Sequence, residues 1–216
     1  LRRLEFEADQ ADDGDFFSVI GGSPGYDDQY WQVSGGRHNV WKATAFLNET
    51  PAYFTSNFRS LWSGAGTDYL SLLNMTPGGL ATAAATQAAL RTELAGTADS
   101  TLSLTRTKYG ARFDFTLSNK WKAYASYSNE EREGSRPYAM VFGGAGGGGN
   151  IEIPESIDYD TMDVLAGIQY VDPLNALNLQ LSASMFRNNI DTQTIENPLT
   201  ITVNTLTGVP ATTFTA

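Results

Sequence analysis

Apolar and polar side chains alternate strictly along residues 108–117. One face carries Tyr109, Ala111, Phe113, Phe115 and Leu117, and the other carries Lys108, Gly110, Arg112, Asp114 and Thr116. Because successive side chains of a β-strand point to opposite faces, this segment predicts a strand that is apolar on one side and charged on the other. Soluble sandwiches also contain such strands, so what matters is how often the pattern recurs along the chain.

The same alternation recurs in most of the sequence. We expect strands over residues 4–8, 15–20, 52–62, 101–117, 121–133, 159–171 and 177–186, and a last β-like stretch over residues 200–206. Residues 30–47 fit either one long strand or two strands that meet at Gly35-Gly36. Strands of roughly ten residues or more match the tilted span of a bilayer, whereas sandwich strands usually have about 5–6.

The connections between the expected strands alternate in length. Short turns are expected at residues 48–51, 118–120 and 172–175, and long connections at 63–99, 134–157 and 187–199. All short turns then fall on one side of an up-and-down sheet, as in outer-membrane β-barrels. Within the first long connection, apolar residues three and four apart predict a short helix over residues 79–95. A soluble β-sandwich remains the alternative on pattern alone.

Composition narrows the possible functions. The 216 residues are 41% hydrophobic with a net charge of −10, which argues against a nucleic-acid-binding protein. No apolar run is long enough to predict a transmembrane helix. The chain has no Cys, which excludes disulfides, thiolate metal sites, iron–sulfur clusters and covalently attached haem within it. It begins at Leu1 without Met or an apolar leader, so we expect any secretory signal to have been removed or to lie upstream.

Polar side chains on the strands are the candidate functional residues. A charge that faces lipid costs roughly 2–4 kcal/mol at the bilayer midplane, so charged side chains on spanning strands should face the lumen. The predicted lumen-facing or partner-facing residues are Lys108, Arg112, Asp114, Asp163, Gln169, Asn178 and Gln180. We further expect Glu130, Arg132 and Arg136 to form either an ion-paired rim on a long outer loop or a solvated strand end.

The sequence predicts no catalytic, cofactor-binding or metal-binding residues, and therefore no enzyme. The sole histidine, His38, follows Gly35-Gly36-Arg37 and is expected to be a solvated turn residue rather than a haem ligand. A single histidine without a nucleophile motif does not predict a hydrolase. The glycine run at residues 143–149 lacks the Lys-Ser/Thr of a phosphate-binding loop and is expected to be a flexible loop tip.

Four sequence strings, in order, resemble the MtrB/PioB family of outer-membrane barrels associated with decahaem cytochromes. They are SGAGTDYLSL at residues 63–72, EEREGSRPY at 130–138, EIPESIDY at 152–159 followed by DVLAGIQY at 163–170, and IENPL at 195–199. The resemblance implies a barrel that sheathes a multihaem c-type cytochrome, with the haem carried by the partner and no cofactor in this chain. Family members are longer than this chain and have wider barrels.

We therefore expect residues 1–216 to be a single segment of an antiparallel, up-and-down transmembrane β-barrel, part of a larger one, with about nine strands visible and one short loop helix. The resemblance implies a non-catalytic role in the bacterial outer membrane, in contact with lipid and a cytochrome, during extracellular electron transfer. A general diffusion porin or solute channel is the alternative function in the membrane. A third hypothesis is a secreted, soluble β protein with a structural or adhesive role.

Overall fold

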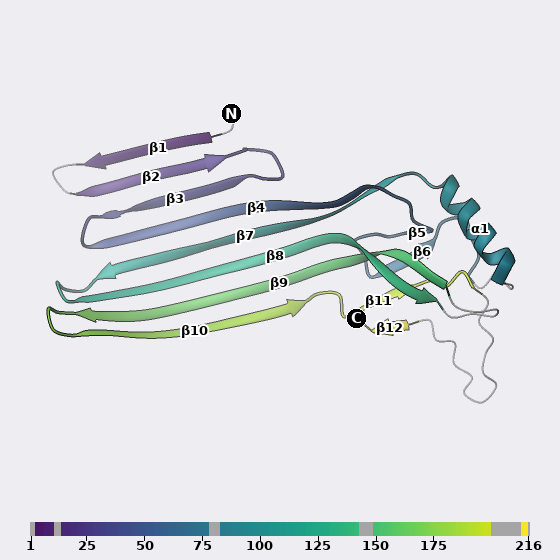
Figure 1. The fold of residues 1–216 in the computed structure, drawn as a ribbon. Helices are drawn as coiled ribbons and strands as arrows, with labels where there is room; N and C mark the ends of the chain where they lie inside the picture. The colour runs from purple at the N-terminus through teal and green to yellow at the C-terminus, as the bar shows by residue number, and fades with distance from the viewer. Residues whose placement is uncertain (1–2, 11–13, 78–82, 143–148, 200–212, 216) are drawn as a thin grey trace. The chain divides into compact units, whose positions relative to one another are not determined.

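The computed structural model describes residues 3–10, 14–77, 83–142, 149–199 and 213–215 (Figure 1). Their elements, in chain order, are β1 (Arg3–Gln10), β2 (Asp15–Gly22), β3 (Tyr30–Arg37), β4 (Trp41–Phe58), β5 (Trp62–Ser63), β6 (Tyr69–Leu72), α1 (Ala83–Gly96), β7 (Ser100–Thr116), β8 (Trp121–Phe142), β9 (Gly149–Val171), β10 (Ala176–Asn188), β11 (Thr192–Ile195) and β12 (Thr213–Thr215). The predicted all-β class with one short helix is confirmed.

The main sheet has eight strands in the order β1-β2-β3-β4-β7-β8-β9-β10. Neighbours in the sheet are neighbours in sequence, apart from β4 and β7, whose connection contains β5, β6 and α1. This is the predicted antiparallel up-and-down order. The sheet is an open part of a barrel wall in the described residues, with β1 and β10 at its edges. The predicted count of about nine strands compares with eight in this sheet.

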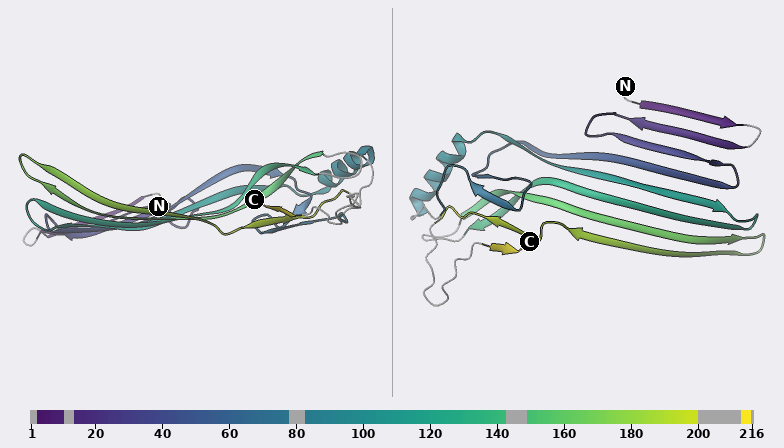
Figure 2. Two further views of the ribbon diagram at one scale, coloured as in Figure 1. Left: turned by 90° about the horizontal axis from the view of Figure 1, so that it is seen from below. Right: turned by 180° about the vertical axis from the view of Figure 1, so that it is seen from behind.

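The chain forms two compact units. Unit 1 comprises residues 1–51, 105–132 and 159–187, and unit 2 comprises residues 52–104, 133–158 and 188–216. In Figure 2 the strands of unit 1 form one layer. Unit 2 contains a second sheet in the order β12-β11-β6-β5, in which β11 runs parallel to β6.

The turn predicted at residues 48–51 is wrong, because β4 continues through it. The backbone N–H of Glu49 still donates to the carbonyl of Gln29 at 2.8 Å, but β3 begins only at Tyr30. Alternate N–H groups of a strand point the same way, so the position of Pro51, two residues on, faces the side where β3 has ended. A proline is tolerated there because no ladder hydrogen bond is lost.

The turn lies instead between β3 and β4. The N–H of Val40 donates to the carbonyl of Arg37 at 3.0 Å, and Asn39 has a positive φ of 61°. Asn tolerates this left-handed conformation better than most residues. Residues 30–47 are therefore two strands, but they meet at residues 38–40 rather than at Gly35-Gly36. The first short turn is therefore moved to residues 38–40.

The two later short turns lie where they were predicted. In the turn after β9, Asp172 accepts hydrogen bonds from the N–H groups of Leu174 at 2.9 Å and Asn175 at 2.8 Å. The Tyr170 hydroxyl also donates to this carboxylate, and these bonds hold the pKa of Asp172 below its usual value. Asp is a common turn residue because its side chain bonds the following backbone in this way.

The second predicted long connection, residues 134–157, is mostly strand. β8 extends to Phe142 and β9 begins at Gly149. The glycine run and the stretch at residues 200–206 lie outside the described residues, except for Gly149 at the start of β9. Helix α1 occupies Ala83–Gly96, and the start predicted at residues 79–82 also lies outside that part of the chain.

The apolar face of unit 1 is exposed. Phe6, Val19, Val33 and Ala45 lie in register across β1, β2, β3 and β4. Further along the sheet, Phe113 is 46% exposed, Phe115 37%, Leu179 68% and Leu181 78%. Within the part of unit 1 that the structure describes, no second layer covers these side chains, which is the arrangement expected of a lipid-facing surface and not of a soluble sandwich core.

No helix among the described residues combines the length and the apolar character needed to cross a membrane.

Candidate functional site

Four of the predicted lumen-facing residues meet on the opposite, polar face of unit 1. Arg112 binds Asp114 through two nitrogens, with an Nη2–Oδ1 distance of 2.7 Å, and its guanidinium lies 5.1 Å from the ring centre of Tyr124. The Tyr124 hydroxyl donates to either Asn178 or Gln180, each 3.1 Å away. Tyr124 thus joins side chains of β7, β8 and β10 across the face, and the sequence analysis missed it.

Gly167 of β9 makes the position of Tyr124 possible. A Cβ atom built on Gly167 would come within 2.4 Å of the Tyr124 ring, so any larger residue would displace the ring. The aromatic ring covers the glycine, a device that strengthens sheets at positions without a side chain. The sequence feature that could have predicted this contact is a glycine on the polar side of an otherwise regular strand.

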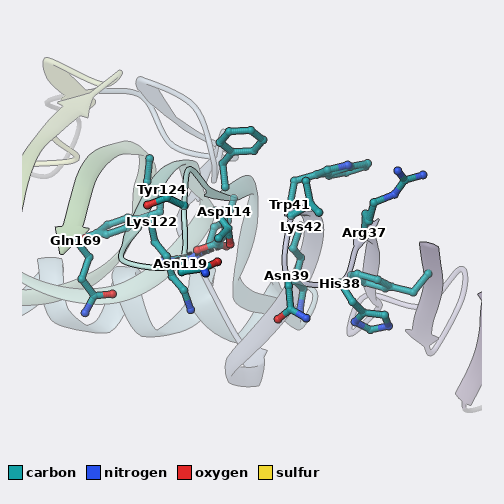
Figure 3. A pocket seen from close by; sticks show the side chains of 17 residues that line it. Arg37, His38, Asn39, Trp41, Lys42, Asp114, Asn119, Lys122, Tyr124 and Gln169 are labelled. Carbon is teal, nitrogen blue, oxygen red and sulfur yellow. Dashed lines mark hydrogen bonds and ion pairs between the residues drawn. The ribbon is translucent and has the colours of Figure 1, made fainter. Parts of the chain in front are cut away.

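A hollow of about 870 Å³ lies on the polar face, near the short turns after β3 and β7. Its lining combines charged, amide and aromatic side chains, which Figure 3 shows. Among the described lining residues, the basic side chains are Arg37, His38, Lys42, Arg112 and Lys122, and the acidic side chain is Asp114. Gln169, another of the predicted residues, also lines the hollow.

His38 lies in the turn between β3 and β4, as predicted. Its Nε2 atom is 3.2 Å from Oδ1 of Asp9, and its ring stacks on Phe16 at 4.8 Å between centroids. The side chain is exposed. Within the described parts of the chain, no three His, Asp or Glu side chains come together in a way that could hold a metal ion.

A second basic cluster surrounds Glu130 of β8. Its carboxylate, 9% exposed, binds Arg132 at 2.7 Å, lies 3.8 Å from the Lys108 ammonium and pairs with Arg106. Three cations therefore surround one carboxylate. Lys108 was predicted to face the lumen and Glu130 and Arg132 to form a rim, and the structure brings these three together, with Arg106 as an unpredicted member.

The placement of Glu130, Arg132 and Arg136 on a long loop is wrong, because all three lie inside β8. The strand continues because β9, which also begins early, lies beside it in the sheet. Arg136 belongs to unit 2, where it pairs with Glu155 of β9. Asp163, the remaining predicted residue, lies on β9 and makes no ion pair with any described residue.

Unit 2 contains a packed core built from the connections between strands. Its buried side chains are Leu61, Trp62, Leu70, Ile153, Ile195 and Leu199. Leu90 and Leu94 of α1 pack against it, which explains the helical spacing of those apolar residues. Three of the four strings that carry the family resemblance, at residues 63–72, 152–159 and 195–199, therefore supply this core.

Hydrogen bonds also connect the segments that supply this core. The Glu196 carboxylate accepts hydrogen bonds from the Tyr69 hydroxyl at 2.9 Å and the Leu72 N–H at 2.7 Å, and the Glu196 carbonyl accepts one from the Trp62 indole at 2.8 Å. The bond to Glu196 raises the pKa of the Tyr69 phenol. Ser156 similarly accepts bonds from the Gly66 N–H and the Gln193 amide. These residues fold the connections and were not predicted as functional.

The family model described as "Putative outer membrane beta-barrel porin, MtrB/PioB" matches residues 3–215. The chain belongs to the MtrB/PioB family. A comparison with curated proteins gives no match. Family membership agrees with the two-faced sheet of unit 1 and identifies the chain as a membrane β-barrel protein. Porin-like barrels such as those of the MtrB/PioB family are typically non-enzymatic.

Proposed function

We propose that this chain is part of a barrel in the bacterial outer membrane that sheathes a multihaem c-type cytochrome for electron transfer across the membrane. The observation that carries the proposal is the two-faced sheet of unit 1. Its apolar face is exposed, as lipid contact requires, and its polar face holds charged and amide side chains in cross-strand networks. The polar face is thus suited to contact with a hydrophilic partner.

The haem chemistry belongs to the partner in this proposal. The chain has no Cys for covalent haem attachment, and its single His38 lies in an exposed turn beside Asp9. The barrel contributes a low-dielectric wall toward lipid and a polar wall toward the cytochrome. It excludes lipid from the path of the electrons and holds the cytochrome in place, without catalysis of its own.

Purification in mild detergent followed by an absorption spectrum tests the proposal. We expect a haem Soret band at a fixed ratio to the barrel protein, because a sheath copurifies with its cytochrome. A matched preparation of an unrelated porin from the same membranes provides the background of loosely bound haem protein. A haem content no higher than this background would contradict the sheath.

A general diffusion porin is the second candidate, favoured by the family description, which names a porin. A porin conducts ions when reconstituted alone in planar bilayers. A sheath conducts poorly while the cytochrome occupies it and conducts once the cytochrome is removed. Equal conductance before and after haem protein is stripped would favour the porin.

A further inference from the structure

Positive charge gathers on three neighbouring strands of a chain that is acidic overall. On the polar face of unit 1, β4, β7 and β8 carry Lys42, Arg106, Lys108, Arg112, Lys122 and Arg132. The acids on the same face of these strands are Asp114 and Glu130. Six positive charges against two negative charges leave a local surplus of four, although the whole chain has a net charge of −10. We name these eight residues the basic lane.

At the short-turn end of the lane, two ammonium groups pair with no carboxylate of the described residues. Lys42 and Lys122 both line the hollow of about 870 Å³, and neither forms an ion pair with any described residue. Both are exposed, and Figure 3 shows them with Asp114 and Tyr124. Asp114 is already bound by Arg112, so it does not neutralise the two lysines.

At the other end of the lane, the surplus charge is held in place. Glu130 is nearly buried and fixes Arg106, Arg132 and Lys108 around one carboxylate. Their side chains are between 34% and 48% exposed, so donors of each remain open to the lumen. Cations that are positioned in advance lose less freedom when they bind an anionic group.

The rest of the polar face has a different chemistry. Glu5, Glu7 and Asp9 alternate along β1, and the polar side of β10 carries the amides and hydroxyls of Asn178, Gln180 and Ser182. Asp163 of β9 adds one negative charge between the lane and β10, so a molecule in contact with this face meets acidic β1, the basic lane and neutral β10 in a fixed order. Such a pattern gives a partner one preferred orientation.

We infer that the basic lane binds a carboxylate-rich surface of the protein that the barrel encloses. This inference rests on the proposed function. Lys122 and Arg132 are ten positions apart on β8, and a strand rises by roughly 3.3 Å per residue, so the lane extends about 33 Å. A small anion fills only one end of such a lane, whereas an acidic protein surface engages both ends. The overall negative charge of the chain disfavours a nucleic acid in this position.

Neutralisation of the two unpaired lysines tests the lane. The variant Lys42→Gln with Lys122→Gln removes two positive charges from it, and Arg91→Gln with Arg187→Gln removes two exposed charges away from the polar face as a matched control. Each protein is purified in mild detergent and washed with rising NaCl, and the retained haem absorbance is measured per barrel. We expect partner binding about tenfold weaker in the lysine variant, the size that two exposed ion pairs supply together, and little change in the control.

The outcomes separate the lane from the proposed function. If the wild-type barrel retains haem and the lysine variant retains it as tightly as the control, the lane inference is overturned and the sheath stands. If the wild-type barrel retains no haem, the sheath fails. In that case the lane inference is tested by the reversal potential of the barrel in a planar bilayer under a KCl gradient. A loss of anion preference in the lysine variant supports the lane as an anion-binding surface. Unchanged selectivity overturns it.

Discussion

Tyr124 and Gly167 show how single positions organise the polar face. The ring of Tyr124 lies over Gly167, carries the Arg112 guanidinium on one side and reaches Asn178 and Gln180 with its hydroxyl. One aromatic side chain therefore aligns polar groups from β7 to β10. The glycine is needed for its lack of a side chain and not for an unusual backbone conformation.

Gly167→Ala is expected to lower the free energy of unfolding by about 1–3 kcal/mol, because the new methyl group would displace the Tyr124 ring. Gly96→Ala is the matched control, since a Cβ there meets no atom within 4 Å. Tyr124→Phe, which removes only the hydroxyl bonds, should cost about 0.5–1.5 kcal/mol. The temperature at which the folded barrel loses its faster mobility on gels measures the stability of each of the three variants. Equal midpoints for the two alanine variants would show that the ring has room to move.

At the scale of elements, the connections of unit 2 are the part with a conventional hydrophobic core. Glu196 is central to them because its carboxylate satisfies the Leu72 N–H and the Tyr69 hydroxyl while its own carbonyl binds Trp62. Segments more than a hundred positions apart in sequence are fastened together at one residue. The long connections are thus folded structure rather than loose loops.

Glu196→Ala should loosen this fold, because it leaves the Leu72 N–H without its acceptor, a loss of about 1–3 kcal/mol. Hydrogen exchange in residues 63–72 is expected to speed up roughly tenfold or more, since local opening sets the exchange rate. Exchange in the strands of unit 1 should not change. Glu133→Ala, an exposed acid on β8, serves as the control, and exchange at residues 63–72 that is no faster than in this control would contradict the role given to Glu196.

The sequence predicted the strands better than their ends. Alternation identified the faces of β7, β9 and β10, because a period of two follows directly from strand geometry. It misplaced the turn at residues 48–51, since Pro51 normally ends a strand and is tolerated here because β3 begins only at Tyr30, one residue after Gln29. Whether a proline is tolerated at this position depends on which strands pair, and the local sequence pattern does not predict strand pairing.

The sequence likewise predicted some residues of the candidate site and missed others. Arg112, Asp114, Asn178 and Gln180 were placed correctly on one face by their spacing, and the structure joins them. Tyr124 was missed because aromatic residues on a strand predict the apolar face. Glu130, Arg132 and Arg136 were assigned to a loop rim because a run of charges is typical of loops, whereas here the charges of residues 130–133 alternate between the two sides of β8.

At the scale of the whole molecule, function depends on one sheet that separates an apolar face from a polar face. The side chains of Leu177, Leu179, Leu181 and Met185 are each more than half exposed on one side of β10, and the polar residues Asn178, Gln180, Ser182 and Ser184 lie on the other side. Such a surface would aggregate in water, so it requires a hydrocarbon environment. The same geometry places the basic lane on the opposite, polar face of the sheet.

Leu181→Lys tests this separation directly. Leu181 is 78% exposed on the apolar face, and a lysine near the bilayer midplane costs about 2–4 kcal/mol, so the folded and inserted fraction in lipid vesicles should fall. Ser182→Lys adds the same charge one residue further on, where the side chain points to the polar face, and should leave insertion nearly unchanged. Gel mobility of unheated samples after refolding into vesicles separates folded from unfolded protein. Because the two variants differ only in the face that receives the charge, equal yields would mean that lipid does not cover the side of the sheet that carries Leu181.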